Sequence, residues 1–155
     1  MSDYALATVC VNGHPLSGDD RISDNFCSVC GALTISDCPN CNRPIRGKVV
    51  KKGVLNLCEY IPPLYCYNCG DPFPWTLQAI QATSELIEED ERLDKLLKEK
   101  LTASLPDIVA ETPKSSLATN RLKRAMVAAG KFTAEGLRQF VIDFGCEFVK
   151  TRLGF

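Results

Sequence analysis

Long apolar runs are missing from this sequence of 155 residues. A helix needs about 20 consecutive apolar residues to cross a bilayer, and the uninterrupted apolar runs here are only a few residues long. The first residues, Met1-Ser2-Asp3-Tyr4, show no basic segment followed by an apolar one, so no secretory signal is visible. The sequence therefore predicts a cytoplasmic protein without a transmembrane segment, in which cysteines stay reduced.

Histidine is also nearly absent, since His14 is the only one in the chain. We find no Ser/His/Asp set, no phosphate-binding loop and no nucleotide-binding fingerprint. Acid–base chemistry by carboxylates stays open on sequence grounds. The acidic run 88–91 is nevertheless more typical of a solvated helix face than of a catalytic site. We therefore predict a protein that is not an enzyme.

Cysteine, in contrast, is abundant and unevenly distributed. Eight of the nine cysteines precede Trp75, and only Cys146 follows it. From Thr76 onward the sequence becomes rich in Leu, Glu, Lys and Ala with helical spacing. We therefore predict a double zinc-binding ribbon domain over residues 1–75 and a helical domain over residues 76–155. The predicted fold class is a small zinc-stabilised β domain of tandem ribbons or knuckles, followed by an all-α region.

Most of the early cysteines form short pairs. A single CxxC pair could be a redox dithiol or two small packed side chains. Four pairs in residues 10–69 indicate metal binding, three of them CxxC and the first Cys10-Val-Asn-Gly-His14. The two-residue gap of a CxxC pair lets one tight turn point both sulfurs at one ion. Gly31 and Gly70 directly follow two pairs and can adopt the positive φ that closes such a turn. We predict two structural Zn²⁺ ions held by Cys10, His14, Cys27, Cys30, Cys38, Cys41, Cys66 and Cys69.

The sequence leaves the pairing of these ligands open. We prefer a sequential scheme, in which the pairs at 10/14 and 27/30 hold the first ion and those at 38/41 and 66/69 hold the second. A nested scheme would close a far longer loop at greater entropic cost. An interleaved cross-brace, as in RING domains, is the main rival, although the RING pattern does not place its histidine in the first pair. Cys58 and Cys146 are left over in every scheme.

Aromatic residues surround the last cysteine pair. We expect Tyr65, Tyr67, Phe73 and Trp75 to pack around the metal site, as is common in small zinc domains. The alternative is a stacking platform for unpaired bases, helped by the nearby basic residues of segment 43–52.

The helical domain shows apolar residues at steps of three and four. Helices are expected at about 76–101, where a break near residue 89 is left open, and at 116–129 and 134–153. Residues 102–116 contain two prolines and are expected to form a connector. Thr133 is expected to cap the last helix, and Gly130 to end the preceding one. The last helix has a wide apolar surface, formed by Leu137, Phe140, Val141, Phe144 and Phe148, with Ile142, Cys146 and Val149 further round.

With these motifs in place, the sequence resembles an uncharacterised bacterial family, domain of unknown function 2321. The resemblance runs through Cys10-Val-Asn-Gly-His14, the three CxxC pairs and Pro72-Phe-Pro-Trp75, and continues to Thr112-Pro113-Lys114 and the Arg121/Lys123 region. It implies a bacterial cytosolic setting and the zinc-ligand roles at the quoted positions. It implies no activity.

The sequence therefore predicts a non-catalytic zinc-ribbon interaction or adaptor protein. Its partner, either another protein or a second copy, is expected to dock on the C-terminal helix. The alternative is a nucleic-acid binder that uses the basic stretches 43–52 and 114–124. Net charge opposes this alternative, because ligation by thiolates lowers it from −1 to about −4.

Overall fold

The structure is a computed structural model that describes residues 3–155. The first two residues of the predicted zinc domain lie outside this range. The chain divides into two compact units, of which the first ends at Gln78 and the second begins at Ala79. No helix within residues 3–155 is long and apolar enough to cross a membrane.

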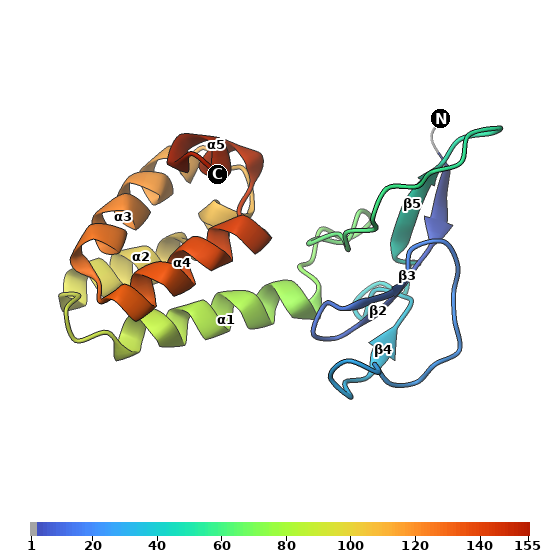
Figure 1. Cartoon of the computed structure of the whole chain (residues 1–155), viewed down its shortest axis with the longest axis horizontal. Helices are drawn as coiled ribbons and strands as arrows, with labels where there is room; N and C mark the ends of the chain where they lie inside the picture. Colours follow the sequence, from blue (N-terminus) through green and yellow to red (C-terminus); the bar gives the residue numbers. More distant parts are fainter. Residues whose placement is uncertain (1–2) are drawn as a thin grey trace. The chain divides into compact units, whose positions relative to one another are not determined.

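The first unit contains short strands joined by long loops (Figure 1). Two antiparallel sheets form, one with strand order β1-β5 and the other with order β3-β2-β4. β2 is fully buried, and its Val9 lies with Ala7 and Ile45 in a small core. The strands are β1 (Asp3–Leu6), β2 (Thr8–Cys10), β3 (Pro15–Ser17), β4 (Thr34–Ile35) and β5 (Arg46–Val50).

The first turn of α1 (Pro74–Glu89) is fixed to the loops of this unit by side-chain hydrogen bonds. Trp75 Nε1 donates to the Pro63 carbonyl at 3.0 Å, and Thr76 Oγ1 donates to the Leu64 carbonyl at 2.8 Å. Both side chains are buried. The helix therefore starts inside the cysteine-rich unit.

The second unit is helical throughout and has its own apolar core (Figure 1). Its helices after α1 are α2 (Lys95–Val109), α3 (Ser115–Ala128), α4 (Lys131–Phe144) and α5 (Glu147–Leu153). The largest side chains that are fully buried in it are Ile87, Leu101, Leu105, Ile108, Leu122, Leu137, Val141 and Val149.

Helix α2 continues past the expected end at residue 101, and Pro106 lies inside it. The prediction of a connector over residues 102–116 is therefore wrong for residues 102–109, which belong to α2. Leu101, Leu105 and Ile108 are fully buried at steps of four and three, so burial favours a continued helix. The proline lies in the last turn, where the loss of its backbone donor affects few hydrogen bonds.

The expected single helix 134–153 is two helices, α4 and α5. Between them, Gly145 and Cys146 are extended, with ψ of 143° and 158°. A Cβ on Gly145 would lie 2.5 Å from the Val141 carbonyl oxygen, and Cys146 N donates to the Ile108 carbonyl at 2.9 Å. The glycine and this bond to α2 explain the break.

The start of α4 also differs from the expectation. The helix begins at Lys131, and its N-cap is Gly130, whose φ of −62° is not left-handed. Gly130 has no side chain that could cap the helix. Asp90, in the turn between α1 and α2, caps it instead, because its Oδ2 accepts a hydrogen bond from Gly130 N at 2.9 Å. Thr133, the expected cap, is buried inside the first turn.

Candidate metal centres

The first cluster joins a β-hairpin to a cysteine knuckle. Cys10 ends β2 and His14 precedes β3, and Cys10 N donates to the His14 carbonyl at 3.0 Å across this tight turn. Cys27 and Cys30 form the knuckle. The His14 imidazole directs Nδ1 into the cluster, at 3.4 Å from the Cys10 sulfur and 3.8 Å from that of Cys27.

The second cluster joins two knuckles. The Cys38 and Cys69 sulfurs are 3.7 Å apart, and those of Cys41 and Cys66 are 3.6 Å apart. Within each cluster all ligand atoms lie within 4.8 Å of one another. The structure therefore brings together all eight side chains singled out from the sequence, in the sequential grouping. Cys58 and Cys146 lie outside both clusters.

The distances between ligand atoms match the edges of a coordination tetrahedron. With Zn–S bonds of about 2.3 Å, tetrahedral geometry separates two sulfurs by about 3.8 Å, and a sulfur from an imidazole nitrogen by about 3.5 Å. Three of the sulfur pairs, Cys10–Cys30, Cys38–Cys69 and Cys41–Cys66, are 3.6–3.8 Å apart. A disulfide would need about 2.05 Å. Both clusters can thus hold one tetrahedral metal ion with four protein ligands each.

The three knuckles repeat one backbone design. The N–H of the residue after the second cysteine donates back to the first cysteine's carbonyl, at 2.8 Å for Gly31, 2.9 Å for Asn42 and 2.9 Å for Gly70. All three residues have positive φ, of 71°, 58° and 78° respectively. The two glycines are visible in the sequence. Asn42 is the equivalent residue that the sequence reasoning missed.

Hydrogen bonds to sulfur make some of these thiols easier to ionise. The backbone N–H of Ala32, helped by the side chains of Asn12 and His14, lowers the pKa of the Cys30 thiol to about 6. The backbone N–H of Arg43 likewise lowers the pKa of the Cys41 thiol to about 7. Since metal ligation requires thiolates, these donors favour ligation by Cys30 and Cys41.

Burial has the opposite effect on Cys38 and Cys10. It raises the pKa of the Cys38 thiol to about 11, and it also raises the pKa of Cys10. A buried thiolate is stable only next to a positive charge. A bound cation would supply that charge in both clusters.

The aromatic residues near the last knuckle divide into two groups. Phe73 and Trp75 are buried and stacked, with ring centroids 4.7 Å apart, as expected for packing residues. Tyr67 is partly exposed, and the Arg46 guanidinium lies over its ring at 3.9 Å and over that of Tyr4 at 4.4 Å. One face of the Tyr67 ring is thus covered by a side chain of the same unit.

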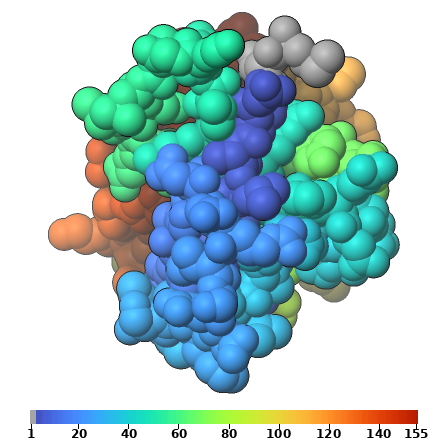
Figure 2. All heavy atoms as spheres, turned by 90° about the vertical axis from the view of Figure 1, so that its right-hand side faces the viewer, coloured from blue at the N-terminus to red at the C-terminus, as the bar shows by residue number. Residues whose placement is uncertain are grey.

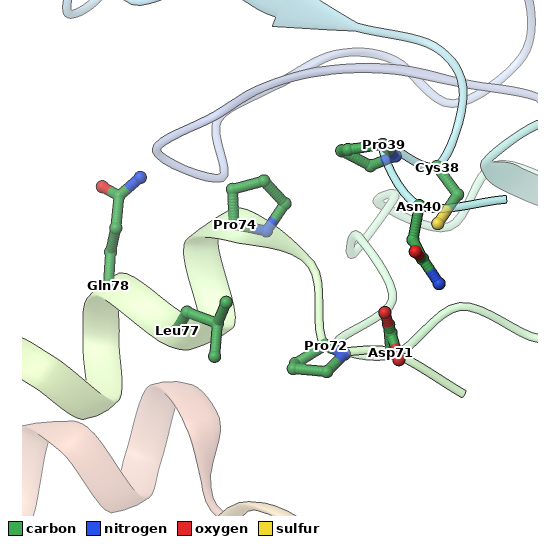
Figure 3. Close-up of a pocket in the computed structure, with 8 residues that line it drawn as sticks. All are labelled: Cys38, Pro39, Asn40, Asp71, Pro72, Pro74, Leu77 and Gln78. Atoms are coloured by element: carbon green, nitrogen blue, oxygen red, sulfur yellow. The ribbon is translucent and has the colours of Figure 1, made fainter. Parts of the chain in front are cut away.

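A hollow of about 480 Å³ lies beside the second cluster. Figure 3 shows its walls, with Pro74, Leu77 and Gln78 on the first turns of α1 and the Cys38 knuckle opposite them. The other lining residues are Pro39, Asn40, Asp71 and Pro72. Proline and leucine dominate these walls, and the only charged residue is Asp71.

The residues of the expected docking helix are distributed between core and surface. Leu137, Phe140, Val141 and Val149 are buried within the helical unit. Ile142 remains 37% exposed, and Phe144, Cys146 and Phe148 are half-buried.

Comparison with known proteins identifies a family but no activity. A search of curated proteins and a search of solved structures gave no match. Residues 3–153 match the family described as an uncharacterised protein conserved in bacteria, DUF2321. This match covers both metal clusters and all five helices. The chain therefore belongs to this bacterial family, as its cysteine motifs predict.

Proposed function

We propose that the protein is a non-catalytic interaction or adaptor protein, built on two structural Zn²⁺ ions. Zinc is the metal that best suits three thiolates with one imidazole, or four thiolates, in tetrahedral geometry. Each cluster supplies four ligands from the protein, so an ion bound there keeps no position for water or substrate. This closed ligand set is the observation that supports a structural role.

Metal analysis of the purified full chain tests the zinc part of the proposal. We expect two zinc ions per chain. Cys30→Ser or Cys69→Ser should remove one ion, whereas Cys58→Ser combined with Cys146→Ser should leave the zinc content unchanged, because neither residue belongs to a cluster. One ion or none in the wild type would contradict the proposal.

The interaction part concerns the C-terminal segment. Ile142 is exposed in the last turn of α4, directly after the buried Val141, and it marks the exposed edge of this helix. We propose that this edge receives a protein partner or a second copy of the chain. Light scattering over a range of concentrations tests self-association, with Ile142→Lys as the variant and Leu117→Lys as a control at another exposed apolar residue. Loss of association in Ile142→Lys alone supports the proposal. If Ile142→Lys unfolds the helical unit and the wild type is a monomer at every concentration, self-association through this edge is excluded.

The positions of the basic residues give little support to the alternative of nucleic-acid binding, because several of these residues contact other side chains of the protein. Arg46 lies over two tyrosine rings, Lys48 pairs with Asp19 at 3.1 Å, and Arg121 donates to Ser104 Oγ at 2.7 Å. We expect only weak binding that disappears at physiological salt. A salt-resistant, sequence-selective complex in an anisotropy titration would support this alternative instead.

A further inference from the structure

The segment 50–61 exposes a group of large apolar side chains. We call this segment the apolar loop; Figure 2 shows it, teal to green, at the surface of the first unit. Leu55, Leu57 and Ile61 are each more than 80% exposed, and Val50 and Val54 are more than half exposed. Soluble domains seldom leave such a cluster without a partner surface.

The backbone of the apolar loop is fixed by hydrogen bonds. Val54 N donates to the Lys51 carbonyl at 3.0 Å and closes a hairpin-like turn. Asn56 Nδ2 donates to the Val49 carbonyl at 3.2 Å, and Tyr60 OH donates to the Arg46 carbonyl at 2.7 Å. The loop is thereby attached to β5. Its apolar side chains are held outward on a defined backbone.

A hollow of about 380 Å³ lies inside this loop. Its walls are mostly apolar, and Lys51 is the one charged residue that lines it. The lining residues are Val49, Lys51, Val54, Leu55, Asn56, Leu57 and Cys58. An apolar hollow with a single cation suits a molecule that has an apolar part and an anionic group.

The charges within the apolar loop are mostly positive, while the acidic Asp3 pairs with Val50 in the β1–β5 ladder. No acidic residue occurs from Arg43 to Cys58, and Glu59 is the only one in the apolar loop. Lys51 and Lys52 are exposed at its turn, and neither forms an ion pair with any residue in the range 3–155. Their charges are therefore available to an anionic surface.

We propose that the apolar loop docks on a bilayer surface that contains anionic lipids. Leucine and isoleucine side chains would enter the boundary between headgroups and acyl chains, while the two lysines remain at the level of the anionic headgroups. The hollow would accept part of one lipid. This site is separate from the metal clusters and from the edge at Ile142, so it goes beyond the function proposed above.

Vesicle flotation of the full chain tests the proposal. We expect binding to phosphatidylcholine vesicles that contain phosphatidylglycerol, and much weaker binding to phosphatidylcholine alone. Lys51→Gln with Lys52→Gln should weaken binding by about tenfold or more, since each cation near such a surface contributes substantially. Leu55→Ser with Leu57→Ser should abolish it. Zinc content and circular dichroism should match those of the wild type.

Matched variants in the helical unit provide the controls. Val127→Ser with Phe132→Ser removes two equally exposed apolar side chains, and Lys123→Gln with Lys131→Gln removes two exposed cations. Neither pair should change vesicle binding. Equal losses in these controls would show non-specific attraction and overturn the proposal.

A fluorescence measurement tests whether the loop enters the lipid. The emission of Leu57→Trp should shift to shorter wavelength when anionic vesicles are added, whereas that of Val127→Trp should not. Absence of both flotation and the shift at low salt would overturn the proposal. So would self-association in solution that Leu55→Ser with Leu57→Ser removes, because the loop would then be an interface between copies of the chain.

Discussion

At the scale of single residues, Asn42 shows how a backbone requirement can be met without glycine. It has a φ of 58° and is the only non-glycine residue with positive φ within residues 3–155. Asparagine tolerates this conformation better than most residues, whereas a β-branched side chain does not. The middle knuckle therefore keeps the same turn as its two glycine counterparts.

We predict that Asn42→Gly is neutral or slightly stabilising, and that Asn42→Val lowers the free energy of unfolding of the metal-bound first unit by about 1–2 kcal/mol. Thermal unfolding monitored by Trp75 fluorescence measures this difference. Asn40→Val is the control, because Asn40 lies in the same knuckle with a negative φ. Equal effects of the two valine variants would show that φ at residue 42 is not the cause.

Asp90 is a second residue whose role depends on distant partners. Hydrogen bonds from the Thr133 side chain and from the Gly130, Arg92 and Leu93 backbones lower the pKa of its carboxyl below the ordinary 3.8. The charged form is therefore favoured in the folded state. Above the ordinary pKa of 3.8, the charged Asp90 carboxylate stabilises the fold to its full extent. This stabilisation is lost as pH falls through the lower folded-state pKa.

We predict that Asp90→Asn destabilises the helical unit by about 1–2 kcal/mol at neutral pH, as expected for loss of a helix cap. Denaturant unfolding followed by circular dichroism should show the difference. It should shrink as pH falls below the ordinary pKa of 3.8, because the carboxyl of the unfolded chain is protonated first, and it should disappear once pH has passed the lower folded-state pKa. Glu91→Gln, a change at an exposed neighbour, should have little effect. A difference that is constant down to strongly acidic pH would contradict a role of the charge.

Sequence reasoning identified these residues only in part. Gly31 and Gly70 can be identified from the sequence, because a glycine after a CxxC pair indicates the positive φ that closes the turn. Asn42 was missed, because asparagine also occurs widely in other turns. The cap of α4 was misassigned, because its carboxylate comes from Asp90, forty positions before Gly130. Local sequence rules do not detect a cap that is supplied by another element.

At the scale of elements, the break between α4 and α5 follows from contacts with α2. Apolar periodicity continues through the break, so the sequence pattern predicts one helix. Gly145 and the bond from Cys146 N to Ile108 interrupt it instead. Pro106 is the opposite case, because the sequence predicts an end of the helix there and the helix continues. Its neighbours Leu105 and Ile108 are buried, and their burial favours the helical conformation. Tertiary packing decides both boundaries.

We predict that Gly145→Ala lowers the free energy of unfolding of the helical unit by about 1–3 kcal/mol, because its Cβ would meet the Val141 carbonyl. Denaturant unfolding measures the loss. Gly130→Ala should have a smaller effect, since the nearest atom to its Cβ would be 3.4 Å away. A larger loss in Gly130→Ala than in Gly145→Ala would show that the clash does not determine stability.

At the scale of the whole molecule, the two units differ in what stabilises them. The helical unit buries a continuous set of aliphatic side chains. The first unit buries few apolar side chains besides cysteine, among them Val9, Ile45, Phe73 and Trp75. Small domains with so little core usually depend on metal for their folding free energy.

We predict that a strong chelator unfolds the first unit while the helices of the second remain. Trp75 is the only tryptophan and is 3% exposed, so its emission should shift to longer wavelength on metal removal. Far-ultraviolet circular dichroism should keep most of its helical signal. Simultaneous loss of both signals would contradict separate stabilisation of the two units.

The division into a cysteine-rich half and a helical half was visible in the sequence, because eight ligands in four pairs leave few alternatives. The grouping of those ligands needed the structure, since several pairings satisfy the same spacing. The apolar loop also escaped sequence reasoning, which found no metal-binding role for its Cys58 and no role for its apolar residues. Leu55 and Leu57 flank Asn56 as they would on one face of a half-buried strand, and the sequence does not show that both side chains are exposed.

The tight turn of the first cluster has a further consequence for the lifetime of the protein. Asn12 Nδ2 donates to the Cys30 sulfur at 3.4 Å, and the next residue is Gly13. Asparagine followed by glycine is prone to spontaneous deamidation, which converts the amide into a carboxylate. Such ageing would replace a donor by a negative charge beside the thiolates. The first metal centre would thus lose affinity with time, while the second, whose knuckles contain no Asn-Gly pair, would persist.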